Sequence, residues 1–390
     1  MIIMKKRILS VLICAALLAG ILSSCAITST REVDLYNSNE TADFGPYKHY
    51  FSTLTEVEKA AYNCIIADIE NFPRNIQVPT MYTEQLERVW MAIMYDNPEL
   101  LLLGKDCGME ITAESSWFYC DYALEKSEYI QKKQRLEKKV EQIKKDLEEI
   151  DGAFAKELYI HDLIIDNCEY VSSNDMIQST AYGALIDGKA SCEGYAKAAK
   201  ILLDAAGIEN YLMCGVAARD DGSEEGHMWN VVIIDGQPYN LDVTWDDPIG
   251  ESNANNKRYS YFNITDEEIK KTHTFDEEPA DCTATEENYF IKTEKVFETY
   301  DANMKTSLSS LIAKVGEEKK LSIRFSSEEA YKKAIKGLFD NQEIYGVLEV
   351  AAKSSKEKFS TKKITYINDD THYVLELILV EPEKESTTKN

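Results

Sequence analysis

The sequence predicts an α+β protein, in which helical and strand-rich blocks follow one another along the chain. Helical periodicity dominates residues 53–167, although residues 104–123 are strand-like. A helix over 192–206 then precedes three strand-like segments, two of which are joined by a hairpin signal. A second mixed region begins near residue 288. These blocks indicate a helix-and-sheet core with a helical region before it and a smaller α+β region after it.

The N-terminal segment has the features of an export signal. Three basic residues precede an apolar run over residues 8–22, which is too short for a comfortable membrane-spanning helix. The run ends in Leu22-Ser23-Ser24-Cys25, which resembles a bacterial lipobox. We expect a signal peptide over 1–24 and a lipidated Cys25. The protein would then be exported and anchored to the outer face of the bacterial cytoplasmic membrane, or to the outer membrane if the source has one. An ordinary signal peptide with an incidental cysteine is the alternative.

The domains are expected to follow this signal in order. Residues 25–52 are polar and predict a tether between the lipid and the globular part. A helical region is expected over 53–167, the core over 168–282, and a small α+β domain over 283–390.

The helical region contains one long charged helix, expected over 125–150. Its apolar residues recur at alternating spacings of four and three, so one apolar seam runs along it. We expect this seam to pack on a neighbouring helix, and a partner-binding coiled coil is the alternative.

Besides the strand-like residues 104–123, strands are expected in two further regions. The core should hold strands over 211–217, 228–234 and 237–244, with a polar loop over 218–226 and a mostly irregular segment over 249–282. The C-terminal region should hold a helix over 328–339 and strands over 320–325, 345–351, 363–367 and 373–380.

The charge of the chain limits its partners. It has 43 basic and 68 acidic residues and a formal net charge of -25. Such an acidic surface argues against nucleic acid as a partner and against electrostatic adhesion to anionic lipid. The acidic residues are expected to serve solubility, and the bilayer is expected to be reached only through the acyl anchor.

Nine cysteines are present, and no two of them form a CxxC pair. A zinc ribbon or a thioredoxin-type site is therefore not supported. An exported protein can hold disulfides, and Cys107 and Cys120 are the first pair to test. The alternative is that most cysteines are small buried apolar residues.

Cys192 is the candidate nucleophile. It lies in Gly188-Lys189-Ala190-Ser191-Cys192-Glu193-Gly194, at the predicted start of a helix. Cysteine attacks as the thiolate, and its ordinary pKa of about 8.5 leaves little thiolate at neutral pH. A helix N-terminus favours a negative charge, and a nearby imidazole can accept the proton.

The hairpin predicted at Asp235-Gly236 brings an imidazole and a carboxylate together. With this two-residue turn, Ile234 faces Gln237. His227 and Asp242 then become diagonal neighbours on one face. The carboxylate can fix the tautomer of the imidazole and stabilise its charged form. Each residue taken singly is more often structural, but the shared geometry favours a Cys-His-Asp triad.

Three motifs in this order resemble the core of the transglutaminase-like superfamily. They are the stretch 188–196 around Cys192, His227-Met228-Trp229-Asn230-Val231 and Asp242-Val243-Thr244-Trp245-Asp246-Asp247-Pro248, preceded by Ala181-Tyr182-Gly183-Ala184-Leu185. The resemblance implies a papain-like α+β core in which a helix-borne cysteine packs on an antiparallel sheet. It also implies nucleophile Cys192, base His227 and orienting Asp242. The regions 53–103 and 125–167 look like the helical lead-in of bacterial lipoproteins of this type.

Further site residues are expected around the triad. An oxyanion needs a donor, and the candidates are the backbone N–H of Cys192 and the side chains of Gln178 and Tyr182. Trp229 and Trp245 are candidates for the pocket wall, although core packing is the alternative for both.

The resemblance implies an enzyme that acts on amide bonds through a thioester. Hydrolysis, as by a cysteine peptidase or amidase, is favoured over transamidation. The expected partner is a protein or peptide substrate, and one associated with the cell wall is an option. No calcium-loop motif appears, so no cofactor and no metal ion are expected. The alternative function is an inert transglutaminase-like surface binding or scaffold protein.

Overall fold

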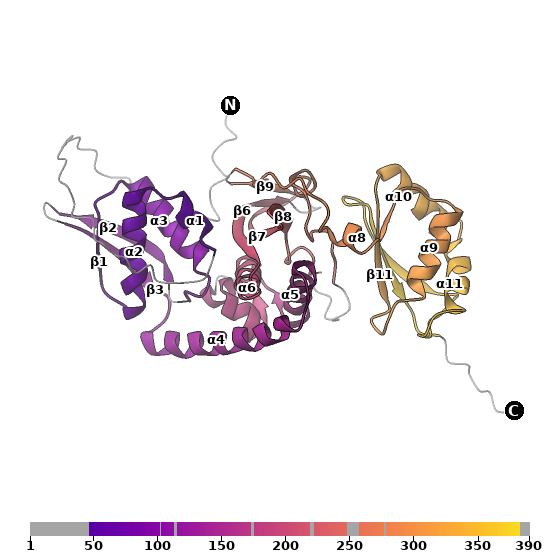
Figure 1. Cartoon of the computed structure of the whole chain (residues 1–390), viewed down its shortest axis with the longest axis horizontal. Coiled ribbons are helices and arrows are strands. Elements are labelled where there is room, and N and C mark those ends of the chain that lie inside the picture. Colours follow the sequence, from indigo (N-terminus) through magenta and orange to yellow (C-terminus); the bar gives the residue numbers. More distant parts are fainter. Residues whose placement is uncertain are drawn as a thin grey trace. The chain divides into compact units, whose positions relative to one another are not determined.

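The computed structural model describes residues 47–382, apart from 102, 113–114, 173–174, 219–221, 248–256 and 277. The expected signal peptide, Cys25 and most of the expected tether lie outside the described residues. Among the described residues, no helix is long and apolar enough to cross a membrane. The chain forms two compact units (Figure 1).

The two units do not follow the expected division of the chain. The first unit contains the chain up to Thr244 and also the later segment Thr272–Cys282. The expected helical region and most of the expected core therefore belong to one unit. The second unit contains Trp245–Lys271 and the chain from Thr283 onward. Hydrogen bonds hold 245–271 to the C-terminal chain: Asn288 Nδ2 donates to the Phe262 carbonyl at 3.1 Å, and Lys320 Nζ donates to the Lys257 carbonyl at 2.6 Å.

The first unit opens with helices and a small sheet. The second helix is capped by Thr55, whose N–H donates to the Glu58 carboxylate at 2.8 Å in a capping box. The strand-like region 104–123 forms two strands, and a three-residue strand that the sequence did not predict joins them in the order β1-β3-β2. The elements are α1 (His49–Thr53), α2 (Glu56–Asp68), β1 (Ile76–Val78), α3 (Thr83–Asp96), β2 (Leu103–Ile111) and β3 (Ser116–Tyr122).

The long charged helix is α4 (Lys126–Glu148), and α5 (Ala153–Asn167) follows it. The seam residues Leu136, Ile143 and Leu147 of α4 are buried. Helix α4 contacts α6 and the segment Gly183–Asp187 within the same unit. The seam is therefore covered inside the first unit, as the packing interpretation expects.

The core consists of helix α6 (Cys192–Ala205) on a four-stranded antiparallel sheet in the order β8-β7-β6-β9 (Figure 1). Helix α6 contacts β6 and β7, and Asn230 Nδ2 donates to the Ala196 carbonyl at 3.0 Å across this interface. The predicted helix-on-sheet fold class is confirmed. The strands are β6 (Glu209–Ala218), β7 (Glu224–Ile234), β8 (Gln237–Leu241) and β9 (His273–Phe275), and a separate parallel pair is formed by β4 (Glu169–Tyr170) and β5 (Lys189–Ala190).

The hairpin register is confirmed, since Ile234 pairs with Gln237 and Asn230 with Leu241. Two boundaries were wrong. Strand β8 ends at Leu241 rather than at Thr244, because the chain turns there. Strand β7 already begins at Glu224, so His227 lies within the strand.

The expectation that 249–282 is mostly irregular missed β9. This strand pairs with β6, so that Gly215 faces Phe275 and Ala217 faces His273. A strand of three residues leaves almost no alternating pattern in a sequence.

The second unit is a helix-and-sheet domain with the strand order β10-β11-β13-β12. The strand predicted over 345–351 is wrong, because this segment is helix α11. Its buried residues Ile344, Val347, Leu348 and Ala351 follow helical spacing, and a short apolar run does not distinguish the two states. The elements are α7 (Asp266–Ile269), α8 (Tyr289–Lys292), β10 (Val296–Phe297), α9 (Ala302–Ile312), β11 (Lys320–Phe325), α10 (Glu328–Ile335), α11 (Ile344–Ala352), β12 (Ile364–Asp369) and β13 (Val374–Leu379).

Candidate active site

Cys192 is the first residue of α6. The preceding residue, Ser191, is extended and donates its N–H to the Gln178 carbonyl at 2.9 Å. A Cβ atom on Gly194 would lie 2.5 Å from that same carbonyl. Glycine is therefore needed here for the 178–180 segment to approach the first turn. The half-buried thiol of Cys192 therefore lies at the N-terminus of α6.

His227 connects this thiol to a carboxylate. Its Nε2 atom lies 2.6 Å from Asp242 Oδ2, and both side chains are buried. The Cys192 side chain lies close enough to this imidazole to contribute to its raised pKa. Because Nε2 is directed at Asp242, Nδ1 is the ring atom that can face the thiol. The structure thus brings together the three residues singled out in the sequence.

A second histidine, His273, completes the surroundings of Asp242 and was missed in the sequence. Its Nε2 atom lies 3.1 Å from Asp242 Oδ2, and its Nδ1 lies 2.8 Å from Thr272 Oγ1. The other carboxylate oxygen, Oδ1, accepts the N–H of Thr244 at 3.0 Å. No motif or spacing marks His273, because only the pairing of β9 with β6 brings it to the site.

His227 and Asp242 are both buried, and each stabilises the charged form of the other. Burial alone would lower the pKa of His227, but the negative charge and hydrogen bond of Asp242, with a smaller contribution from Cys192, raise it to about 10. Burial alone would raise the pKa of Asp242, but His227 and then His273 hold it well below its usual range. At neutral pH the pair is an imidazolium and a carboxylate. Such an imidazolium can stabilise a thiolate and can donate a proton to a leaving amine.

Trp229 packs behind both imidazoles. Its ring centroid lies 6.2 Å from that of His227 in a stacked arrangement and 5.3 Å from that of His273 in an edge arrangement. Its indole N–H donates to Asn240 Oδ1 at 3.0 Å, and the residue is 1% exposed. These contacts correspond to core packing, the alternative given for Trp229 above. Trp245 belongs to the second unit and packs edge-on against Tyr261, so its role as a pocket wall stays a prediction.

The two oxyanion candidates differ in their surroundings. The Gln178 backbone lies beside the N-terminus of α6, and its buried Oε1 atom has no hydrogen-bond partner among the described residues. The buried Tyr182 hydroxyl also has none in the described part of the chain, but its ring packs under Lys132 and Arg135 of α4. The oxyanion role stays a prediction for both, and the position of Gln178 suits it better.

The histidines and Asp242 also have the composition of a metal site. Three ligand atoms from His227, Asp242 and His273 lie within 4.8 Å of one another, and such donors can hold zinc. In the structure, however, Asp242 Oδ2 lies at hydrogen-bonding distance from both rings, so the N–H protons lie where an ion would bind. The expectation that no metal is needed stays a prediction.

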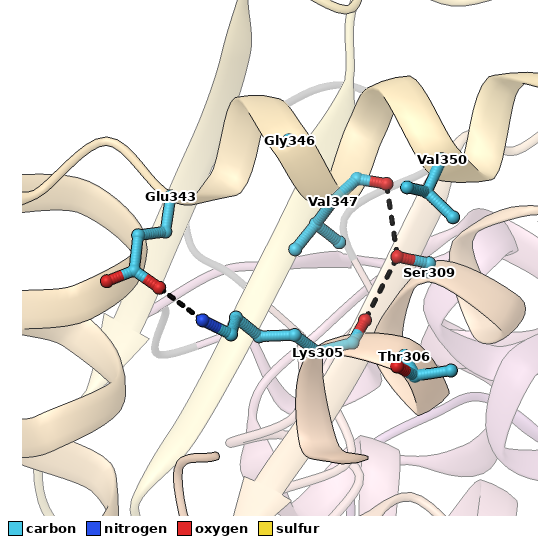
Figure 2. A pocket seen from close by; sticks show the side chains of 7 residues that line it. All are labelled: Lys305, Thr306, Ser309, Glu343, Gly346, Val347 and Val350. Carbon is cyan, nitrogen blue, oxygen red and sulfur yellow. Dashed lines mark hydrogen bonds and ion pairs between the residues drawn. The ribbon is translucent and has the colours of Figure 1, made fainter. Parts of the chain in front are cut away.

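A surface pocket in the second unit offers no comparable chemistry. It lies between α9 and α11, with Lys305, Ser309, Glu343 and Val347 in its lining (Figure 2). Lys305 pairs with Glu343, and the Ser309 hydroxyl is 3.2 Å from the Val347 carbonyl. Lys305, Glu343 and Ser309 thus have partners within the walls of this pocket, and the Thr306 hydroxyl donates to the Ala302 carbonyl.

Gly215→Ala should disturb the candidate active site through the pairing of β6 with β9. A Cβ atom at this position would lie 1.8 Å from the Thr274 carbonyl and 3.0 Å from the Trp229 ring. We expect β9 to move away from β6 and to take His273 with it. The alkylation rate of Cys192 should fall about tenfold, and stability should fall by roughly 1–3 kcal/mol. Gly316→Ala is the control, because its Cβ would meet nothing within 4 Å. Equal behaviour of the two variants in alkylation and thermal unfolding would contradict the assigned role of Gly215.

Three comparisons with known proteins were made. The family profile described as the transglutaminase-like superfamily matches residues 137–243. A comparison with curated protein sequences gives no match. Among solved structures, the chain is similar to a cysteine protease candidate from Cytophaga hutchinsonii, with 23% identity, a TM-score of 0.25, and coverage of 28% of this chain and 37% of that one. It is also similar to a structure described as a TGase, with 12% identity, a TM-score of 0.25, and coverage of 43% and 48%. The chain therefore spans less than half the length of either structure.

Proposed function

Because residues 137–243 form a domain of the transglutaminase-like superfamily, we propose that this protein is a thiol-dependent enzyme acting on amide bonds of proteins or peptides. The observation that carries the proposal is the placement of the half-buried Cys192 thiol beside His227, whose imidazole is hydrogen-bonded to the buried Asp242 carboxylate. A thiol at a helix N-terminus, paired with a charged imidazole, is the arrangement that nucleophilic catalysis requires.

The reaction begins when the Cys192 thiolate attacks the amide carbonyl. A C–S bond forms, and the carbonyl electron pair moves to oxygen. The tetrahedral intermediate collapses to a thioester, the C–N bond breaks, and His227 gives its proton to the leaving amine. Asp242 keeps the imidazole oriented throughout and stabilises its charged form. Water then attacks the thioester carbonyl while His227 takes up one of its protons. The C–S bond breaks, the carboxylic acid is released, and the Cys192 thiolate and the His227 imidazolium are restored.

We propose hydrolysis rather than transamidation as the main outcome. Water needs no binding site of its own, whereas a lysine-like amine must be bound beside the thioester to compete with water. The resemblance of the motifs to those of bacterial members of the superfamily supports the same choice.

The enzyme is proposed to act outside the cytoplasm, as a lipoprotein anchored through Cys25. The charged and apolar segments before Leu22-Ser23-Ser24-Cys25 support this location. Membrane fractionation tests it: wild type should be found with the membranes, and Cys25→Ala should be released. Equal partition of the two proteins would exclude the acyl anchor.

A peptide library tests the activity. Wild type and Cys192→Ala are incubated with the library, with and without a primary amine, and the products are identified by mass spectrometry. Wild type should release new N-termini in both conditions, and Cys192→Ala should do so about 10³-fold more slowly. Cys64→Ser is the matched control, because Cys64 is a half-buried cysteine in α2, outside the triad.

The other outcomes are equally informative. Amine adducts without new N-termini would replace hydrolysis by transamidation. Absence of both products from wild type would favour the inert binding protein and overturn the enzymatic proposal.

A further inference from the structure

We propose that Cys107 and Cys120 form an intramolecular disulfide that joins the edge strand β2 to the central strand β3. The inference does not depend on the proposed activity. It concerns the small sheet of the first unit, and neither residue belongs to the triad.

The register places the two cysteines directly opposite each other, since Cys107 pairs with Cys120 in the antiparallel β2–β3 ladder. The type of pair follows from the turn. The Thr112 N–H donates to the Ser115 carbonyl at 2.9 Å, which marks that pair as hydrogen-bonded. Hydrogen-bonded and non-hydrogen-bonded pairs alternate along an antiparallel ladder. Counting back by the continuous register, Cys107 and Cys120 occupy a non-hydrogen-bonded position.

Such a position suits a disulfide. Opposite Cα atoms in non-hydrogen-bonded pairs are about 4.5 Å apart, which lies within the range of about 4.4–6.8 Å that disulfides span. The two cysteines are not joined in the structure, so the geometry is present before the bond is made. Among the strand pairs of the described residues, no other two cysteines face each other.

Both thiols are half-buried, so a small oxidant can reach them. Burial raises the pKa of Cys120 to about 11, against a smaller lowering by its hydrogen bond to Tyr122. Little thiolate is therefore present at neutral pH, and uncatalysed oxidation should be slow. A disulfide-forming catalyst in an oxidising compartment would speed it.

The oxidant is a second disulfide, carried by a protein or by a small molecule. One cysteine thiolate attacks a sulfur of this disulfide, which releases one thiol and leaves a mixed disulfide. The other cysteine then attacks the mixed disulfide and releases the second thiol. The two cysteines together lose two electrons and two protons, and the acceptor is reduced to two thiols.

The bond would strengthen a weak part of the sheet. Strand β2 is an edge strand, and its register shifts between Leu103 and Cys107. Gly104 and Gly108 on the same strand offer no side chain for packing beside Cys107. A covalent link at Cys107 would fix the register just where the regular ladder ends.

The test uses the full chain in a Cys192→Ala background, so that the candidate nucleophile does not consume the oxidant. The protein is equilibrated with oxidised glutathione, remaining thiols are alkylated, and the protein is digested. Trypsin leaves both cysteines in one peptide, because no Lys or Arg lies between them, whereas Glu110 and Glu114 allow cleavage by a glutamate-specific protease. Oxidation should lower alkylation of both cysteines about tenfold. The two glutamate-specific fragments should stay together until a reductant is added.

Two further variants separate the possible outcomes. With Cys107→Ser, the linked fragments should disappear, and with Cys64→Ser they should remain, because Cys64 lies on α2. Fragments that separate without a reductant after oxidation, or a link from Cys107 or Cys120 to another cysteine, would overturn the proposal. Because no activity is measured, failure here would leave the enzymatic proposal untouched.

Discussion

Asp242→Asn is expected to lower kcat/KM for amide hydrolysis by about 10³- to 10⁴-fold while the fold persists. In the wild-type protein, the carboxylate raises the pKa of His227 to about 10 against the effect of burial. Without that charge, burial dominates, and the pKa of His227 should fall below its ordinary value of 6.5. The imidazole is then neutral at pH 7 and neither stabilises the thiolate nor protonates the leaving amine.

The pH profile identifies this cause. Wild-type activity should fall as the pH rises through about 10, where His227 loses its proton. In Asp242→Asn, this alkaline limb should move below 6.5, and NMR titration of the His227 ring should follow it. The control is Asp204→Asn, which removes a half-buried aspartate that pairs with Lys200 at 3.1 Å, outside the triad. If Asp242→Asn keeps its alkaline limb near 10, Asp242 does not set the charge of His227.

The same shifts give the sign of the stability changes. The pKa of His227 is raised on folding, so its contribution is complete below about 6.5 and is lost as the pH rises through about 10. The pKa of Asp242 is lowered on folding, so its contribution is present above about 3.8 and is lost as the pH falls through its folded value. His227 and Asp242 therefore stabilise the fold most fully between about pH 3.8 and about pH 6.5.

His273→Ala is expected to lower kcat/KM by about 10- to 100-fold, as loss of a supporting hydrogen bond does in other sites. His273 is a positioning residue, because it contacts Asp242 rather than the thiol. Its hydrogen bond and charge help to lower the pKa of Asp242. Removing the ring should therefore raise the pKa of Asp242, and the acid limb of the activity profile should move to higher pH.

The conservative variant separates positioning from packing. The side-chain amide of His273→Gln can still donate one hydrogen bond to Asp242, so part of the rate and of the acid limb should be restored. A residue that only fills space would lower the melting temperature in both variants and leave the acid limb unchanged. Measuring kcat/KM against pH together with thermal unfolding distinguishes these outcomes.

The proximity of His227 and Asp242 could be predicted from the sequence because a short turn determines how the two strands beside it pair. The two-residue loop at Asp235-Gly236 fixes every pair along β7 and β8, and thereby brings Asp242 to His227. The start of α6 at Cys192 could likewise be predicted, because the helical pattern begins at this residue. These features depend on residues close to one another in the chain.

What could not be predicted depends on contacts between distant segments. Strand β9 acquires its place only by pairing with β6, so His273 had no local signature. Helix α11 was mistaken for a strand because its run of apolar residues is short, and only the packed domain reveals its buried face. The assignment of 245–271 to the second unit depends on partners such as Asn288 and Lys320, which come later in the chain.

The path of the chain between the two units has a consequence for dissecting this protein. The chain leaves the first unit just after Asp242 and returns to it with His273. The intervening segment carries Phe262, Ile264 and Ile269, which are buried in the folded chain. A fragment that stops at residue 282 would therefore expose an apolar loop whose two ends are attached to the carboxylate and to its second imidazole. We therefore expect the shortest fragment that folds on its own to be set by this segment rather than by the end of the sheet, and to include the C-terminal unit.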